Sequence, residues 1–201
     1  MRGGKREFTY SRLMYWVAVD RGIRIAHDRS FPAPRERWLE VRDRIYRDIF
    51  ENCWNEELEA FAQAKGSPNL DASVLLMPMM KFIGATDPRW LSTLATIERN
   101  LVDDSLVYRY RTPDGLAGGE GTFNMCTFWY VECLARAGQL DKARLVFEKM
   151  LGYANHLGLY AEELGPRAEH LGNFPQAFTH LGLISAAWNL DQQLNAVGWR
   201  A

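Results

Sequence analysis

Two adjacent carboxylates stand in the segment "YAEELGPRAEHLGNFPQAF", residues 160–178, which connects two helix-like stretches. Glu162 and Glu163 are followed by a Gly-Pro turn and then by Gly-Asn-Phe-Pro, which leads into an apolar helix. A carboxylate held at such a place can serve as a general acid or a general base. Most glutamates are simply solvated, so the doublet taken alone favours a structural role for both residues.

The sequence lacks the motifs that would indicate a metal site or a cofactor site. The sequence has no His-x-x-x-His, no Cys-x-x-Cys and no Asp-rich loop, so we predict no metal site. The glycine-rich "AGGEG" lacks the Gly-Lys-Ser/Thr of a phosphate loop, and no dinucleotide fingerprint is present. We therefore expect no cofactor. His170 and His180 could line a site, although satisfied or solvated histidines are commoner.

Bulk composition indicates a soluble globular protein that occupies one domain, 1–201. The 201 residues are 47% hydrophobic and carry a net charge of −1, which gives no reason to expect nucleic acid or a membrane as partner. No apolar run reaches the length of a membrane span. Cys126 and Cys133 lie about 10 Å apart along one helical run, too far to bridge, so we expect buried free thiols in the cytoplasm.

The rest of the chain must position these residues, and its hydrophobic pattern is helical throughout. Asp71 and Asp87 are predicted N-caps, and Pro78 is expected to kink its helix. About seven helical segments can be drawn, at 8–27, 35–52, 71–83, 88–102, 122–138, 141–156 and 175–195.

These segments alternate between helices that are apolar nearly all round and helices with one apolar stripe. A helix that is apolar all round must be covered on every side, whereas an amphipathic one can face water. Strict alternation favours an all-α toroid in which inner and outer helices follow one another. An irregular helical bundle is the alternative.

Turn-rich, polar segments precede each predicted inner helix: "RGGKRE", "KGSPNL", "GLAGGEG" and "HLGN". The N-terminal ends of the inner helices, called the rim below, therefore collect the glycines and polar groups. Free backbone N–H groups and positive dipole ends at helix N-termini suit polar ligands. We expect a site at the rim.

The same segments resemble glycoside hydrolase family 15, the glucoamylase-like and trehalase-like enzymes. The resembling stretches are "RGGKREFTYSRLMYWVAVDRGI", "DASVLLMP", "VYRYRTPDGLAGGEGTFNMCTFW" and "LYAEELGPRAEHLGNFPQAFTHLGLI", in family order over nearly the whole chain. The resemblance implies a barrel of six α/α hairpins and inverting hydrolysis of α-glucosidic bonds in carbohydrate metabolism. Its substrate would be an α-glucoside or oligosaccharide.

Inversion needs a carboxylic acid and a carboxylate base roughly 6.5–9.5 Å apart, with a water between the base and the sugar. By resemblance Glu162 falls on the family's general base, and Glu163 becomes a supporting neighbour. The family's general acid precedes the stretch that matches the first residues here, so we expect that acid to lie outside this chain. The sequence then represents the C-terminal part of the catalytic barrel, a partial (α/α)6 toroid that is inactive alone.

Further rim residues each have two interpretations. Arg109 matches a sugar-contacting arginine, or it pairs with Asp103 or Asp104 on the surface; Arg111 replaces it if the register is shifted. Glu120 could bind a sugar hydroxyl, or could sit in the first turn of a helix. Tyr10 is a candidate for stacking on sugar, whereas Trp129 is expected in the core.

Asn173 is expected to cap the last helix. The competing function is a non-catalytic helical module that binds sugar or another chain. In either case we expect exposed apolar faces on the end helices, through which the chain could self-associate.

Overall fold

A computed structural model describes residues 6–112 and 120–198. The glycine-rich turn at 115–119 and the start of the "RGGKRE" stretch lie outside the described residues. The helices are α1 (Thr9–Asp28), α2 (Arg35–Asn52), the 3-10 helix η1 (Ala72–Leu75), α3 (Leu76–Met79), α4 (Pro88–Leu101), α5 (Asn124–Arg136), α6 (Leu140–Leu151) and α7 (Ala177–Ala196). The strands are β1 (Trp54–Asn55), β2 (Ala60–Phe61), β3 (Val102–Asp103), β4 (Leu106–Val107), β5 (Thr122–Phe123), β6 (Glu163–Leu164) and β7 (His170–Leu171).

The predicted helix starts at Asp71 and Asp87 are confirmed. The Asp71 side chain accepts the N–H of Ser73 at 2.8 Å, and the Asp87 side chain accepts the N–H of Arg89 at 2.9 Å. Pro88 follows Asp87 as the first residue of α4, where its missing N–H has no helical partner to lose. Local capping chemistry therefore sets these boundaries.

The predicted helix at 71–83 is wrong in its length. The segment forms η1 and the single turn of α3 and then ends, because Lys81 takes a left-handed backbone with φ of 61°. Pro78 lies inside the short first turn of α3, where no helical hydrogen bond needs its nitrogen, so it does not kink a longer helix.

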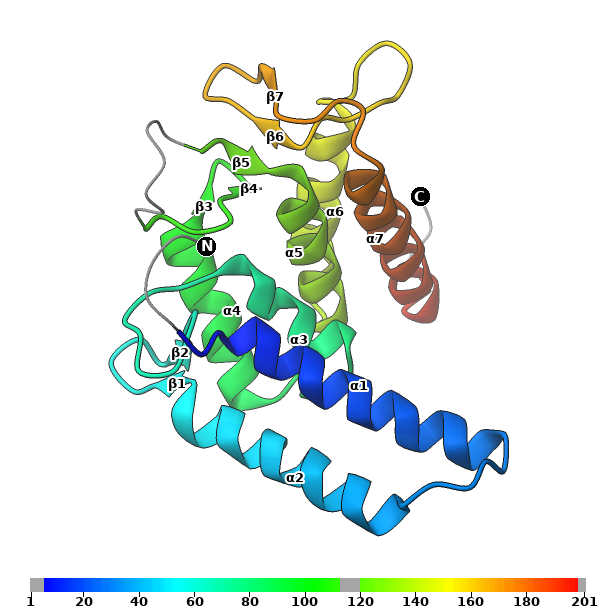
Figure 1. Cartoon of the computed structure of the whole chain (residues 1–201). Coiled ribbons are helices and arrows are strands. Elements are labelled where there is room, and N and C mark those ends of the chain that lie inside the picture. Colours follow the sequence, from blue (N-terminus) through cyan, green and yellow to red (C-terminus); the bar gives the residue numbers. More distant parts are fainter. Residues whose placement is uncertain (1–5, 113–119, 199–201) are drawn as a thin grey trace.

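Helix α5 is the centre of the molecule. Eleven of its 13 residues are buried, as the all-round apolar pattern predicts. Figure 1 shows α6 and α7 running alongside α5, with the α1–α2 hairpin crossing below them. Burial of a large apolar side chain such as Phe128 or Leu134 contributes roughly 1.5–3 kcal/mol each, so α5 is the main anchor for its neighbours.

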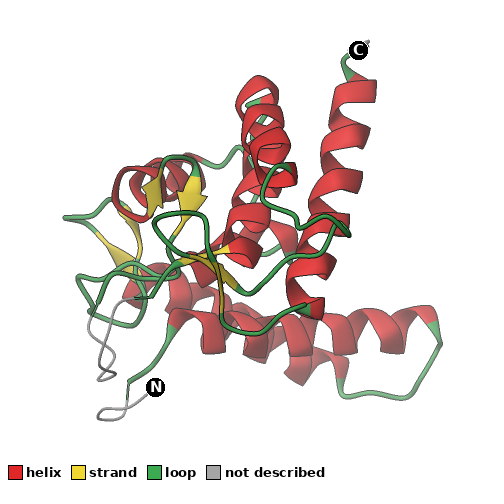
Figure 2. Ribbon diagram, turned by 90° about the horizontal axis from the view of Figure 1, so that it is seen from above, coloured by secondary structure: helices red, strands yellow, loops and turns green. Residues whose placement is uncertain are grey.

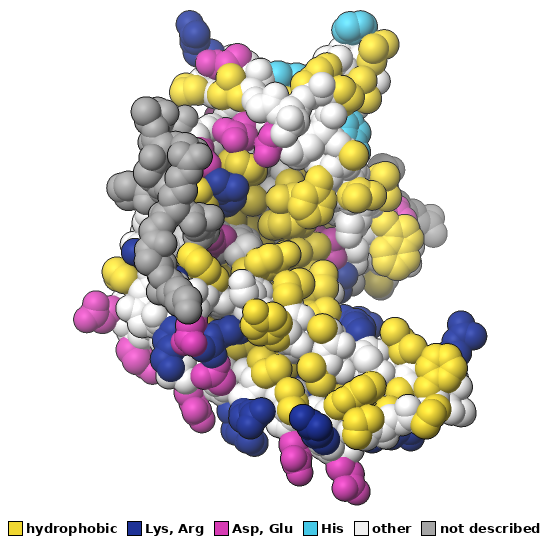
Figure 3. All heavy atoms as spheres, viewed as in Figure 1, with side chains coloured by type: hydrophobic (Ala, Val, Ile, Leu, Met, Phe, Trp, Pro, Cys, Tyr) yellow, Lys and Arg dark blue, Asp and Glu magenta, His cyan; other side chains and the backbone are white. Residues whose placement is uncertain are grey.

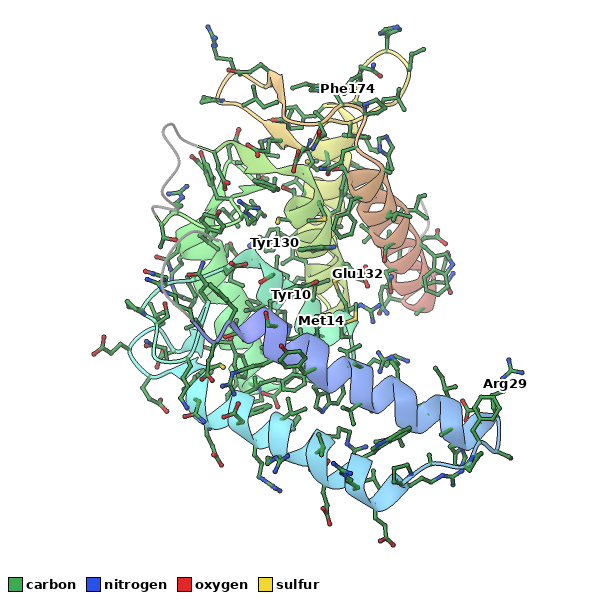
Figure 4. All side chains as sticks on the ribbon, in the orientation of Figure 1. Tyr10, Met14, Arg29, Tyr130, Glu132 and Phe174 are labelled. Carbon is green, nitrogen blue, oxygen red and sulfur yellow. The ribbon has the colours of Figure 1, made fainter. Side chains whose placement is uncertain are left out.

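Helices α5 and α7 are joined by a buried polar network. The Glu132 side chain, 2% exposed, accepts Nε and Nη2 of Arg136 at 2.8 and 2.7 Å. Its other oxygen accepts the Ser185 hydroxyl at 2.7 Å, and Arg136 also donates to Asn189. Glu132, labelled in Figure 4, lies in the second half of α5. These bonds fix the register of α7 against α5.

Helices α1 and α2 are held against the rest by an aromatic cluster. Trp16 on α1 meets the edge of Phe82 at 5.1 Å between ring centroids. Phe50 on α2 packs against Phe61 and Phe82 at 5.3 and 5.7 Å. The start of α1 is fixed separately, because Thr9 donates its N–H to Gln63 and its hydroxyl to Ala62.

The loops carry short strands that the sequence analysis did not predict. Strand β6 pairs antiparallel with both β5 and β7, placing Glu163 opposite Phe123 and Leu171. Figure 2 shows the strands gathered on one side of the helices. This three-stranded sheet binds the loop before α5 to the loop before α7.

Apolar side chains remain exposed on the end helices, as predicted for an arc of helices. On α7 they recur at helical spacing along one face, called the α7 stripe: Phe178, Leu181, Ile184 and Trp188, 54–64% exposed. On α1, Tyr15 and Ile25 are 65% and 56% exposed. Figure 3 shows hydrophobic side chains gathered over the middle of the face seen there.

Candidate active site

Glu162 has its backbone fixed on both sides. Its carbonyl accepts the N–H of Asn124, the first residue of α5, at 3.1 Å. Its own N–H donates to the carbonyl of Asn173 at 3.0 Å. The residue therefore lies at the N-terminal end of the central helix, as the rim prediction requires.

The Glu162 carboxylate is held by Asn173. One oxygen, Oε2, accepts both the backbone N–H and the side-chain Nδ2 of Asn173, at 3.1 and 2.8 Å. Within the described part of the chain the other oxygen, Oε1, makes no hydrogen bond. The predicted helix cap at Asn173 is wrong, because α7 begins after Gln176 without any side-chain cap. The segment Gly-Asn-Phe-Pro fits either a helix cap or a hydrogen bond to Glu162, so the sequence alone does not reveal this contact.

Glu163 points to the other side of the strand. Its Oε2 accepts the N–H of Gly121 at 2.8 Å, which ties β6 to the entry of β5. Burial raises the pKa of Glu163, with Glu120 and Glu162 adding to the rise, while the Gly121 N–H and Arg109 oppose it. The two neighbouring glutamates thus have different surroundings. Glu163 lies near the charged groups of Arg109 and Glu120, whereas the Glu162 carboxylate is bound by the neutral Asn173.

Arg109 and Glu120 face each other beside Glu163. Arg109 donates through Nη2 to Glu120 and to the Tyr110 hydroxyl, and its guanidinium lies 4.6 Å from the centre of the Phe123 ring. The alternative pairing with Asp103 or Asp104 is wrong for Arg109; it fits Arg111, whose Nη2 lies 3.9 Å from Asp103. The alternative considered for Glu120, a place in the first turn of a helix, is also wrong, because α5 begins at Asn124.

This pair keeps unused hydrogen-bonding capacity. Burial alone would lower the pKa of Arg109, but Glu120 and Tyr110 raise it above its usual value, so the guanidinium stays charged. Among the described residues, the buried atoms Nε of Arg109 and Oε2 of Glu120 have no hydrogen-bond partner. Buried polar atoms of this kind are normally satisfied, so a polar ligand or water suits this place.

A relay of hydrogen bonds connects this cluster to the start of α1. Gln63, which accepts from Thr9, donates its side chain to Asp71 at 3.3 Å. Ala72 then donates its N–H to the carbonyl of Arg109 at 2.8 Å. The starts of α1 and η1 are therefore joined to the backbone of Arg109. Tyr10 follows Thr9 in the first turn of α1, is 41% exposed and is labelled in Figure 4.

Other aromatic and imidazole residues serve the structure. Trp129 is 8% exposed and meets Phe178 edge-on, which confirms the core prediction. His170 Nε2 lies 2.8 Å from the carbonyl of Tyr153. His180 accepts the Tyr160 N–H on Nε2 and contacts the Gln176 carbonyl through Nδ1. Both histidines thus hold the loop that carries Glu162.

Within residues 6–112 and 120–198, no group of three or more His, Cys, Asp or Glu side chains is arranged to hold a metal ion. In the same ranges, no helix combines the length and apolarity needed to cross a membrane.

The family of this chain follows from comparison with known protein families. The model of the glycosyl hydrolases family 15 matches residues 1–188. The chain belongs to glycosyl hydrolase family 15. The resemblance read from the four sequence stretches is confirmed, and with it the assignment to the glycosyl hydrolases.

Among the relatives of this family 15 chain are trehalases. A trehalase from Thermoplasma volcanium is 44% identical over 191 residues, which cover 94% of this chain and 31% of the relative. A trehalase from Mycobacterium tuberculosis is 44% identical over 190 residues, covering 92% and 28%. The chain thus spans about a third of the length of the curated relatives it matches.

Solved structures of glycosidases share the fold of this family 15 chain. A glycosidase variant in complex with glucose aligns with a TM-score of 0.80 at 17% identity, covering 94% of this chain and 53% of that one. A bacterial glucoamylase complexed with acarbose gives 0.75 at 17% identity, covering 92% and 33%. The predicted α/α toroid is confirmed as the fold, of which this chain forms a part.

Proposed function

We propose that this chain is the part of an inverting α-glucosidase that supplies the general base, Glu162. The observation that carries the proposal is the position of its carboxylate. Glu162 lies at the start of α5, its Oε2 is engaged by Asn173, and its Oε1 makes no hydrogen bond within the described residues. An oxygen in that state can accept a proton from water.

The neighbouring groups fit the binding of a sugar. Arg109 and Glu120 offer a charged donor and a charged acceptor with buried, unpartnered atoms, and both suit sugar hydroxyls. Tyr10, exposed at the start of α1, offers an aromatic face to a substrate placed over the rim. Glu163, hydrogen-bonded to Gly121, supports the loop and takes no part in proton transfer.

In this proposal the general acid comes from a part of the fold outside residues 1–201. The acid protonates the leaving oxygen while the base activates a water on the opposite face of the sugar. Since the chain matches only about 31% of the Thermoplasma relative, the walls of the substrate site are shared with that other part. The chain alone is then expected to release no glucose.

Trehalose is the first substrate to test, because the relatives are trehalases. The chain would replace the matching third of the Thermoplasma enzyme in a chimera. Glucose release from trehalose, maltose and isomaltose would be followed by proton NMR, which distinguishes the anomers. Inversion predicts that one of the two glucose molecules released from trehalose is first seen as the β-anomer.

The matched variants are Glu162→Gln and Glu163→Gln in that chimera. Loss of the base predicts a fall in kcat of about 10²–10⁴-fold for Glu162→Gln with sugar binding retained. Glu163→Gln should be much milder. If Glu163→Gln lowers kcat more than Glu162→Gln does, the general base is Glu163. Full activity in both variants would contradict the proposal.

A second candidate function is an interaction module without catalysis. The α7 stripe favours it, because its four apolar side chains are 54–64% exposed. Inactivity of the chimera on all three sugars, together with self-association of the chain, would favour this candidate.

The three buried free cysteines, in either case, suit the cytoplasmic location predicted from the sequence.

A further inference from the structure

Asn173 and Glu162 are joined by three hydrogen bonds although they are 11 residues apart. The Glu162 N–H donates to the Asn173 carbonyl at 3.0 Å. In return, the backbone N–H and the side-chain Nδ2 of Asn173 donate to a single atom, Oε2 of Glu162, at 3.1 and 2.8 Å. The carboxylate is therefore oriented as well as bound, since both donors converge on one of its two oxygens.

Gly172, together with Asn173, forms the contact surface of this carboxylate, called the seat of Glu162 below. Its φ is 72°, and a Cβ added there would meet Oε2 of Glu162 at 2.8 Å and its Cβ at 3.0 Å. The side chain of Glu162 thus lies directly against a bare backbone. Residues 172 and 173 together enclose the Glu162 carboxylate on the side of Oε2.

We propose that Asn173 is a positioning residue for Glu162, one that fixes Oε2 and leaves Oε1 to receive the proton of the attacking water. This inference rests on the proposed function of Glu162. The amide of Asn173 suits the role because it is a neutral donor. Aspartate has the same shape but would bring a second negative charge against Glu162, and alanine would remove the side-chain donor.

The other charged groups near Glu162 do not replace Asn173. Glu163, its neighbour, bonds Gly121 and repels Glu162, while Arg109 and Glu120 are paired with each other beyond it. His170 and His180 are engaged by backbone groups of Tyr153, Tyr160 and Gln176. Within the described residues, Asn173 supplies both hydrogen bonds that the Glu162 side chain receives.

The test is a titration of the Glu162 carboxyl carbon by ¹³C NMR on the 201-residue chain, with Glu162→Gln used to assign the signal. A hydrogen bond to the ionised form favours that form, so losing it moves the midpoint upward. We expect Asn173→Ala to raise the midpoint through loss of the donor, and Asn173→Asp to raise it further through like-charge repulsion.

The matched control is Asn195→Ala. Asn195 also donates its side-chain amide to a carboxylate, that of Asp191 at 3.1 Å, but it lies at the far end of α7. This variant should leave the Glu162 midpoint unchanged. A midpoint that also stays unchanged in both Asn173 variants would overturn the inference. If Asn173→Ala does not fold, the isosteric Asn173→Asp decides by the same measurement.

Activity in the trehalase chimera separates this inference from the proposed function. Asn173→Ala should lower kcat with little change in KM and should move the acidic limb of the pH–rate profile upward, because the base is protonated at higher pH. A shifted titration in an inactive chimera would sustain the positioning of Glu162 and remove its catalytic role. A shifted titration with an unaltered rate profile would overturn the part played by Asn173 in catalysis.

Discussion

Glu163 accepts the backbone N–H of Gly121 at 2.8 Å, and this bond crosses from the strand that follows Glu162 to the strand that leads into α5. Gly121 has no room for a side chain, because a Cβ there would meet the carbonyl oxygen of Leu164 at 2.4 Å. The carboxylate of Glu163 is thus held in a close contact between two loops, which explains why it is partly enclosed.

The first prediction concerns pH and Glu163. Burial, with Glu120 and Glu162 adding, raises the pKa of Glu163 above its value in the unfolded chain, so the folded state holds the proton to higher pH. The stabilisation from this group is complete below the unfolded pKa and is lost as pH rises through the folded pKa. Glu163→Gln cannot ionise. Its Tm relative to the parent chain should therefore be higher at pH 7 than at pH 4, measured by calorimetry; an equal difference at both values would contradict it.

The second prediction compares Gly172→Ala with Gly138→Ala. Both glycines have positive φ, 72° and 79°, so each substitution should cost about 1 kcal/mol in backbone strain. Only at Gly172 does the added methyl meet Glu162, whereas nothing lies within 4 Å of it at Gly138. Gly172→Ala should lose about 1 kcal/mol more in urea unfolding. Equal losses would show that Glu162 moves aside freely.

The third prediction tests the network between α5 and α7. Arg136→Ala leaves the buried carboxylate of Glu132 with one hydrogen-bond partner among the described residues, the Ser185 hydroxyl, and should lower the free energy of unfolding by about 3–5 kcal/mol. Arg42 is a matched control, because its Nε and Nη2 also converge on one carboxylate oxygen, that of the half-exposed Asp43. Arg42→Ala should cost about 0–1 kcal/mol.

The fourth prediction concerns the α7 stripe. Leu181→Glu with Trp188→Glu replaces two side chains that are 62% and 64% exposed. We expect the parent chain to associate and this double variant to sediment as a monomer in analytical ultracentrifugation, because large exposed apolar patches drive association. Leu145→Glu with Leu151→Glu, on exposed positions of α6, should leave the association in place. A monomeric parent chain would contradict the prediction.

Helices were the most predictable part of this fold, because their signals are local. The caps at Asp71 and Asp87 and the all-round burial of α5 follow from neighbouring residues in the sequence. The segment 71–83 was overextended because its apolar composition does not reveal the left-handed turn at Lys81. The carbonyl of Met80, next to this turn, accepts Nη2 of Arg21 from α1 at 2.9 Å, and such a long-range contact cannot be predicted from helix propensity.

The loop sheet and the site contacts were less predictable. Strands β5 and β6 contribute only two residues each and come from distant parts of the chain, so their pairing has no periodic signal. Asn173 lies where a helix cap is common, and its contact with Glu162 spans 11 residues of the loop that carries β6 and β7, which no periodic pattern predicts. The turn-rich segments predicted a rim at the starts of the inner helices, and Glu162 does lie beside the start of α5. The pairing of Arg109 with Glu120 is visible only in the fold.

The turn that joins β6 to β7 is built apart from the residues that hold Glu162. Pro166, Arg167 and Ala168 are exposed, and the turn is closed by backbone bonds between Gly165 and Glu169 and between Ala168 and Gly165. Lengthening a surface loop adds only a slowly growing closure cost. A fluorophore or a short peptide tag inserted at Arg167 would therefore report on this loop while leaving the seat of Glu162 intact.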